Sequence, residues 1–223
     1  MIPAKELDLQ FIKRAYNRRS WVYSKTVAPL EWENHLIAIQ RAQIRLGEKV
    51  LEVAVGPGFT LTELAKLVGT QTRIYGVDLS TSMLNLTRGR LEAHGFSNFD
   101  LREADCRNLP FDDNTFDVLY NGYMLDLIPF ADMSGILQEF QRVLKPSGRM
   151  ILLNMSKHDE EVVTPREKLY TRLPASLALY VMGGCRPVLM ESLVKAAHFQ
   201  SVQRVFLDGR FPSEIVMGIK PMT

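Results

Sequence analysis

The stretch from residue 49 to residue 60 constrains the fold more than any other part of the chain. It reads Lys-Val-Leu-Glu-Val-Ala-Val-Gly-Pro-Gly-Phe-Thr. The apolar, β-branched half over 50–55 is typical of a strand buried on both faces of a sheet. Gly56, Pro57 and Gly58 then break the strand, because a backbone without large side chains turns sharply and lets a ligand approach closely. Four apolar residues follow at helical spacing: Leu61, Leu64, Ala65 and Val68. The stretch therefore predicts a strand, a tight turn and a helix, which is half of a βαβ nucleotide-binding unit.

A second signal lies at Asp78, the last residue of the next apolar run, 73–78. A carboxylate at the tip of the second strand can accept hydrogen bonds from both hydroxyls of a ribose. The free N–H groups of the glycine turn and the positive end of the following helix lie at the same edge of a parallel sheet. The two signals together predict an adenosine-type ligand.

From residue 49 onward, apolar strands and amphipathic helices alternate, which predicts a doubly wound α/β sheet. We expect parallel strands at 50–55, 73–78, 99–105, 116–121 and 149–154, with a turn at 145–148. Two last strands, 201–207 and 214–219, are so close in sequence that they must form an antiparallel hairpin. The prediction is a Rossmann-like fold: one seven-stranded, mostly parallel sheet in a single domain, residues 49–223, preceded by a helical lid or extension, residues 1–48.

Two segments do not follow this alternation. Residues 16–23 are dense in aromatic and basic side chains, and they are consistent with a lid over a ligand pocket or with a flap packed on the core. Residues 156–187 are longer than a simple connection, and inserted material at this edge commonly shapes a substrate pocket. We expect one or two short helices there, broken near Pro174 and stopped at Gly183 and Gly184.

Composition narrows the functional classes. With 46% hydrophobic residues among 223, the chain can bury one core, and its formal charge of +2 is too small to favour nucleic acid. Cys106 and Cys185 cannot form a disulfide framework and have no partners at zinc-ligand spacing, so we expect a cytoplasmic protein without a metal site. No apolar stretch approaches the roughly 18 residues of a membrane-spanning helix. A small-molecule substrate is the expected partner, and the oligomeric state, a homodimer included, is open.

Four stretches make the chain resemble the class I S-adenosylmethionine-dependent methyltransferases, and within them the quinone-biosynthesis and related small-molecule branch. Residues 50–58 resemble the first motif of that family, an acidic residue followed by alternating glycines, with Ala54 in place of the first glycine. Residues 75–80 resemble the second motif, and residues 104–117 resemble the third, which is the most specific. Residues 144–148 resemble the turn before the fifth strand.

The resemblance implies S-adenosylmethionine as the cofactor and S-adenosylhomocysteine as its product. It implies that Glu52 holds the amino end of the cofactor, that Asp78 binds the ribose and that Asp105 accepts from the adenine amino group. Leu79 and Met83 would pack on the adenine. The full set of implied cofactor positions is Glu52, Ala54, Val55, Gly56, Gly58, Thr60, Asp78, Leu79, Met83, Asp105, Cys106 and Asn121.

The sequence says less about the residues that would bind the methyl acceptor. Methyl transfer from a sulfonium by in-line displacement needs mainly geometry, because the cofactor carries the reactive group, so a general base is optional. For a phenol or an enolisable carbon the candidate bases are Tyr16, Tyr23, Tyr123, Asp126 and His158. Tyr16 and Tyr23 are also candidates for substrate contact, and Arg186 is a candidate for pairing with an acidic substrate. The alternative for each candidate base is packing in the core or on the surface, and the alternative for Arg186 is a solvated position in the loop.

Two other functions remain open. A NAD(P)-dependent oxidoreductase shares the glycine turn and the acidic ribose residue, but it favours a third glycine where this chain has Leu61. A non-catalytic or repurposed S-adenosylmethionine-binding protein would keep all of the motifs. The sequence identifies neither the acceptor nor whether carbon, oxygen or nitrogen is methylated.

Overall fold

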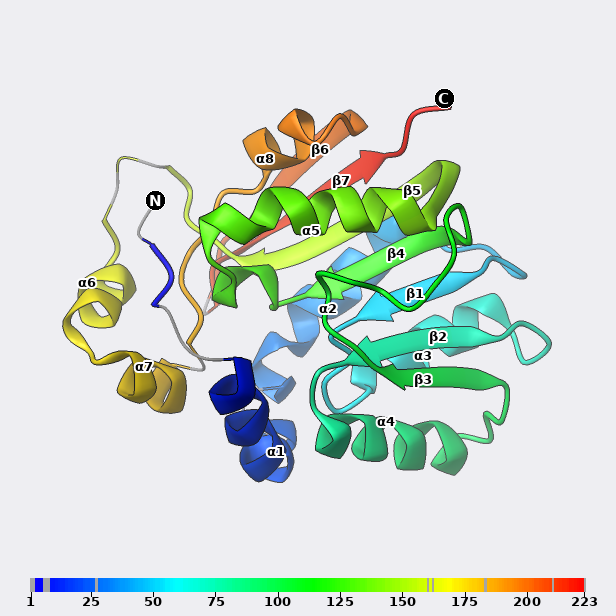
Figure 1. Ribbon diagram of the computed structural model, residues 1–223, viewed down its shortest axis with the longest axis horizontal. Coiled ribbons are helices and arrows are strands. Elements are labelled where there is room, and N and C mark those ends of the chain that lie inside the picture. Colours follow the sequence, from blue (N-terminus) through cyan, green and yellow to red (C-terminus); the bar gives the residue numbers. More distant parts are fainter. Residues whose placement is uncertain are drawn as a thin grey trace.

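The computed structural model describes residues 3–5, 9–26, 28–159, 161, 163–182, 184–209 and 211–222. At its centre is a sheet of seven strands in the order β3-β2-β1-β4-β5-β7-β6 (Figure 1). The strands are β1 (Val50–Val53), β2 (Ile74–Asp78), β3 (Phe99–Glu103), β4 (Phe116–Gly122), β5 (Leu144–Met155), β6 (Gln200–Leu207) and β7 (Ser213–Ile219). Strands β1 to β5 pair in parallel, and β7 is antiparallel to both β5 and β6. The predicted mostly parallel sheet with a C-terminal antiparallel hairpin is confirmed.

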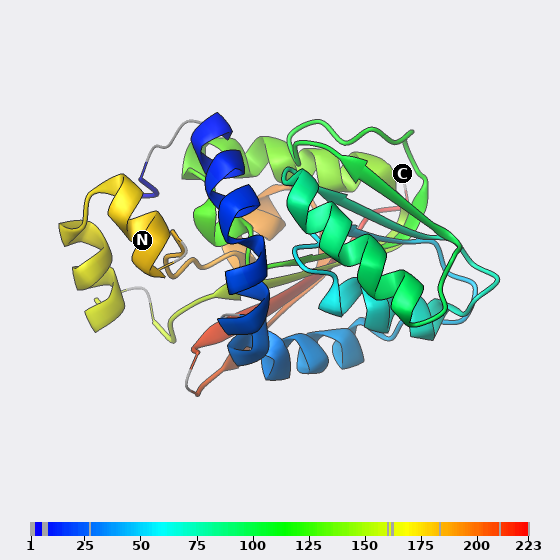
Figure 2. The same cartoon turned by 90° about the horizontal axis from the view of Figure 1, so that it is seen from below.

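Helices cover both faces of this sheet (Figures 1 and 2). They are α1 (Leu9–Thr26), α2 (Ala28–Ala42), α3 (Phe59–Val68), α4 (Thr81–Ala93), α5 (Phe130–Val143), α6 (Pro165–Arg172), α7 (Ala175–Met182) and α8 (Glu191–Ala196), with a 3-10 turn η1 (Leu125–Leu127). Side chains alternate between faces along a strand. Leu51 of β1 accordingly packs in the layer under α5 and α8, whereas Val50 packs in the layer under α2, α3 and α4.

Three strand boundaries differ from those predicted by more than one residue. The first strand stops at Val53, because Ala54 has φ 62° and leaves the extended conformation. The third strand stops at Glu103, so Asp105 lies in the loop beyond it. The fifth strand begins earlier than predicted, at Leu144, because Leu144 already pairs with Phe116 of β4; residues 145–148 form the irregularity between this pair and the pair of Arg149 with Val118.

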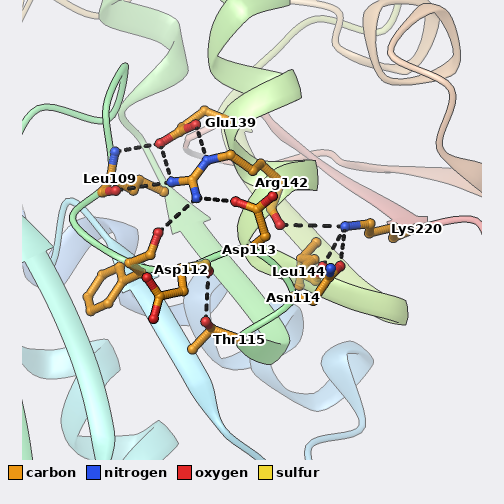
Figure 3. A network of polar contacts seen from close by, with 10 residues as sticks. Leu109, Asp112, Asp113, Asn114, Thr115, Glu139, Arg142, Leu144 and Lys220 are labelled. Carbon is orange, nitrogen blue, oxygen red and sulfur yellow. Dashed lines mark hydrogen bonds and ion pairs between the residues drawn. The ribbon is translucent and has the colours of Figure 1, made fainter.

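The long loop from β3 to β4 is anchored by Arg142 of α5 (Figure 3). Its guanidinium donates to both carboxylate oxygens of Glu139 at 2.8 Å and to Asp113 at 2.7 Å. It also donates to two carbonyl oxygens of the loop. Charge-assisted, bidentate hydrogen bonds of this kind are among the stronger ones in proteins, and Glu139 above all raises the pKa of Arg142. Most of the third motif therefore serves to return the chain from the carboxyl edge of the sheet to the start of β4.

Gly58 sits at the start of α3 in a conformation that other residues adopt only with strain. Its φ is 80°, and a Cβ built there would lie 2.7 Å from the Cα of Thr87 in α4. Helices α3 and α4 can therefore approach each other closely because Gly58 has no side chain. This contact holds the turn after β1 in place.

Replacing Gly58 by alanine should lower the free energy of unfolding by roughly 2–4 kcal/mol, since it adds both backbone strain and a clash with Thr87. Urea denaturation measures this change. The matched control is Gly89→Ala within α4, where an added Cβ meets no atom within 4 Å. That variant should gain up to about 1 kcal/mol from helix propensity. Equal stability of the two variants would contradict the packing argument.

Candidate functional site

A pocket of about 660 Å³ opens at the carboxyl edge of the parallel strands. Its floor comes from the ends of β1, β2 and β4 and from the segments that follow β1 to β4. Its opposite wall comes from α1 and from residues 127–132. Figure 2 shows α1 running across this edge of the sheet. The pocket thus lies where strand order reverses between β1 and β4, the usual ligand site of an open α/β sheet.

Asp78 is hydrogen-bonded to the turn that follows β1. Its Oδ2 accepts from the Gly56 N–H at 2.9 Å, and its Oδ1 accepts from the Ser80 N–H at 2.8 Å. Burial raises the pKa of Asp78 to about 6, against the opposing effect of these N–H donors. A carboxylate has about four lone-pair positions, so Asp78 retains acceptor capacity for a hydroxyl group of a ligand in the pocket that it lines.

Two polar side chains lie buried behind the pocket floor on neighbouring strands. Glu52 is 2% exposed and Asn121 is fully buried. The Asn121 amide donates to the Val53 carbonyl at 2.8 Å, but Asn121 Oδ1 and Glu52 Oε2 have no hydrogen-bond partner among the described residues. Burial, and then the charge of Asp78, raises the pKa of Glu52. Buried acceptors without partners are costly, so both groups fit a ligand that brings a donor, such as an ammonium group, to this end of the pocket.

The other end of the pocket combines apolar and acidic side chains. Leu79, Met83 and Cys106 line it, and burial raises the pKa of the Cys106 thiol to about 12. Asp105 accepts from the Arg107 N–H at 3.0 Å and from its guanidinium at 3.1 Å. The same guanidinium donates to Asp132 at 2.8 Å, so Arg107 joins two parts of the pocket rim.

The structure brings seven of the twelve implied cofactor positions into the pocket lining: Ala54, Gly56, Asp78, Leu79, Met83, Asp105 and Cys106. Besides Glu52 and Asn121, three positions lie behind it. Val55 packs in the layer under α3 and α4, and Gly58 packs on Thr87. The Thr60 hydroxyl lies 3.0 Å from His35 Nδ1 under α2. These three shape the turn from behind.

Of the five candidate bases, Tyr16 and Tyr123 reach the pocket. Burial, with the nearby Cys185 and Asp126, raises the pKa of Tyr16 well above its ordinary value. The Tyr123 hydroxyl lies 2.8 Å from Ser213 Oγ and accepts from the Asn34 amide at 2.9 Å, and burial raises its pKa as well. Both phenols are therefore protonated at neutral pH and offer hydroxyl groups rather than phenolates.

Asp126 and His158 do not line the pocket. Asp126 is fully buried in η1, where burial raises its pKa to about 6 and its Oδ2 accepts from the Met155 N–H at 3.2 Å. His158 is exposed and contacts Phe206. The side chain of Tyr23 lies outside the described residues.

Arg186 is fully buried behind the pocket wall instead of facing a substrate. It donates to the carbonyls of Asp126 and Ile128 at 2.7 and 2.8 Å, and its guanidinium stacks 4.5 Å from the Phe130 ring. These contacts tie down the segment 126–130, part of which forms the pocket wall. Arg186 thus positions the wall.

Sequence reasoning named Tyr16 as a contact residue but not the other residues of α1 that line the pocket. Leu9, Ile12 and Lys13 line the pocket beside Tyr16. The spacing of these residues was visible in the sequence, but spacing does not tell which element a helix face meets. Asn17 provides that docking: its Oδ1 accepts from the Ser80 hydroxyl at 2.6 Å and from the Ser82 N–H at 3.2 Å, at the start of α4.

Residues 50–148 match a family model described as a methyltransferase domain. This segment is therefore similar to known methyltransferase domains. The chain is 35% identical over 134 residues to a ubiquinone/menaquinone biosynthesis C-methyltransferase UbiE from Cellvibrio japonicus, covering 60% of this chain and 53% of the relative. It is 30% identical over 150 residues to a demethylmenaquinone methyltransferase from Geobacillus stearothermophilus, covering 66% and 63%. The chain thus spans between half and two thirds of the length of these relatives.

Solved structures share the fold of this chain. A S-adenosylmethionine-dependent methyltransferase from Aquifex aeolicus superposes with a TM-score of 0.62 at 18% identity, covering 96% of this chain and all of that one. The [4+2]-cyclase SpnF superposes with a TM-score of 0.68 at 17% identity, covering 86% and 81%. The predicted class I methyltransferase fold is confirmed, and the cyclase is a reminder that a fold alone does not decide the reaction.

Replacing Arg186 by glutamine should lower the free energy of unfolding by roughly 2–4 kcal/mol, because two buried carbonyls lose a charged donor. Urea denaturation measures the loss. The control is Arg73→Gln, an exposed arginine whose removal should stay within about 0.5 kcal/mol. An Arg186→Gln variant as stable as this control would show that Arg186 does not hold the pocket wall.

Proposed function

We propose that the protein transfers a methyl group from S-adenosylmethionine to a carbon of a small, quinone-type ring. The observation that carries this proposal is Asp78, hydrogen-bonded to the glycine turn at the floor of a pocket within a methyltransferase domain. The names of the two curated relatives, which refer to quinone methylation, support the choice of acceptor.

The pocket residues fit the cofactor at each of its parts. Asp78 would accept from the ribose hydroxyls, and Glu52 would attract the ammonium group of the methionine moiety. Leu79 and Met83 would pack on the adenine, whose amino group would donate to Asp105. The bound cofactor supplies an electrophilic methyl group on a sulfonium that leaves as a neutral thioether.

The acceptor would lie against the wall that α1 and residues 127–132 provide. Leu9, Ile12, Leu127 and Ile128 make this wall mostly apolar, which suits a flat ring. The Tyr16 phenol can donate to a ring oxygen at the same wall. Holding the ring carbon in line with the methyl group would contribute roughly 7–11 kcal/mol through proximity.

We also propose the cytoplasm as the compartment, since Cys106 and Cys185 are not joined in a disulfide.

Asp78→Asn should weaken S-adenosylhomocysteine affinity by roughly 10- to 100-fold, because hydroxyl groups bind a carboxylate more strongly than an amide. In the unaltered protein the affinity should fall about 10-fold from pH 7 to pH 5, since the ligand favours the ionised form of a group whose pKa is about 6. Isothermal titration calorimetry at several pH values measures both effects.

The control for this experiment is Asp112→Asn, an exposed carboxylate outside the pocket lining, which should leave the affinity and its pH dependence unchanged. The Asp78→Asn variant should lose the pH dependence between 5 and 7. Thermal stabilisation by NAD in place of S-adenosylhomocysteine would favour an oxidoreductase and remove the proposal.

With labelled S-adenosylmethionine and a hydroquinone that has an open ring carbon beside a hydroxyl, the label should appear on that carbon. Mass spectrometry of the product locates the methyl group. Substituting Ile12 by Asp should abolish this transfer while S-adenosylhomocysteine binding persists, because a charge is placed in the acceptor wall. Cofactor binding with no transfer to carbon, oxygen or nitrogen acceptors would favour a repurposed binding protein, as the cyclase with this fold illustrates.

A further inference from the structure

Helix α1 concentrates the positive charge of the protein. Its eighteen residues contain five basic side chains and no acidic one. The basic residues are Lys13, Arg14, Arg18, Arg19 and Lys25. The formal charge of the whole chain is only +2, so the rest of the chain is net negative. A helix of one charge sign on an otherwise slightly acidic protein needs an explanation beyond solubility.

The exposed side chains of α1 form one stripe. Arg14, Arg18, Trp21, Val22 and Lys25 follow one another at spacings of one, three and four residues, which places them along one side of a helix. All five are exposed, and Trp21 has 65% of its surface open. We call these five residues the α1 stripe. Trp32, the other tryptophan of the chain, instead packs on Phe59 with ring centroids 5.9 Å apart.

The opposite side of α1 is already used within the protein. Leu9, Ile12 and Tyr16 face the pocket, and Asn17 binds the start of α4. The stripe therefore points away from the protein while the inner face of the same helix forms the pocket wall. The inner face of α1 is thus held by contacts within the protein, and its outer face presents the basic side chains and the Trp21 indole to solvent.

Other elements near α1 also expose apolar and basic side chains. Leu30, near the start of α2, is 47% exposed. Helices α6 and α7 lie beside α1 in both views (Figures 1 and 2). The backbone N–H of Lys5, just before α1, donates to the Tyr170 hydroxyl of α6 at 2.9 Å. Around that contact the segment exposes Val163, Leu169, Leu177, Lys168 and Arg172.

We propose that the α1 stripe docks the protein on an anionic lipid surface. Cations near such a surface are attracted by the negative headgroups, and a tryptophan ring is most stable at the boundary between headgroups and acyl chains. A basic helix with a tryptophan on its exposed face has the composition of helices that lie in this boundary. A charged protein groove would satisfy the cations but would leave the indole without an apolar environment. The surface goes beyond the methyl-transfer proposal and does not depend on it.

Docking through the stripe has a consequence for the pocket. Because its wall is the inner face of α1, the pocket would lie one helix diameter from the lipid. An apolar acceptor dissolved in the lipid could then reach Leu9 and Ile12 without crossing a long aqueous path. The docking helix would thus belong to the acceptor side of the site.

Co-sedimentation of the full chain with vesicles tests the proposal. Phosphatidylcholine vesicles containing phosphatidylglycerol should bind the protein, pure phosphatidylcholine vesicles should bind it weakly, and added salt should release it. The triple variant Arg14→Gln, Arg18→Gln, Lys25→Gln should lower the partition coefficient about 100-fold. Trp21→Ala should lower it about 10-fold through lost apolar burial. The control variant Lys66→Gln, Leu67→Ala removes an exposed basic and apolar pair on α3 and should bind normally.

Fluorescence locates the contact. Brominated acyl chains should quench the emission of Trp21 in anionic vesicles, and the Trp21→Phe variant, which retains only Trp32, should not be quenched. Three outcomes would overturn the proposal: equal binding to neutral and anionic vesicles, full binding by the triple variant, or self-association in solution with no vesicle binding. Unchanged thermal stabilisation by S-adenosylhomocysteine in every variant separates these outcomes from misfolding and from failure of the cofactor assignment.

Discussion

The hydrogen bond from the Gly56 N–H to the Asp78 carboxylate holds the site together. It joins the turn after β1 to the end of β2, beside the ladder bond from the Val55 N–H to the Val77 carbonyl at 3.1 Å. The turn can reach this geometry because Ala54, Gly56 and Gly58 all have positive φ. For Ala54 this conformation costs about 1–2 kcal/mol, which the fold retains at the pocket floor. The pocket floor and the start of α3 both depend on this turn.

Most of the sheet could be predicted from the sequence, because apolar runs of strand length alternate with amphipathic helices. The presence of Asp78 and Asp105 at one edge was also predictable, since parallel strands end on the same side. The depth at which each polar side chain lies below the pocket was not predictable. Glu52 on β1 and Asn121 on β4 are buried behind the pocket floor, and the Thr60 hydroxyl lies beside His35 of α2. The sequence predicts that a residue lies near the end of a strand. Whether its side chain reaches the pocket depends on how the helices pack on the sheet, which the sequence does not show.

The structure of the segment 156–187 was predicted only in part, for a different reason. Its two helices, α6 and α7, and their division near Pro174 follow from proline and glycine positions, as predicted. Thr164 and Glu167 form a capping box at the start of α6, a signal that the sequence contained and that was not used. The burial of Arg186 had no such signal, because it arises where this segment folds back on η1, a contact between residues 58 and 60 positions apart. Long-range contacts of this kind carry no local pattern.

The cofactor side and the acceptor side of the pocket share one residue, Ser80. Its N–H positions the Asp78 carboxylate, and its hydroxyl donates to Asn17 of α1 while accepting from the Met83 N–H at the start of α4. A continuous chain of hydrogen bonds therefore runs from Gly56 through Asp78 and Ser80 to α1. The helix that lines the pocket wall is held by the same serine that orients the Asp78 carboxylate. Displacing α1 would break the hydrogen bond from the Ser80 hydroxyl to Asn17, so the pocket wall and the pocket floor form one structural unit although they come from distant parts of the chain.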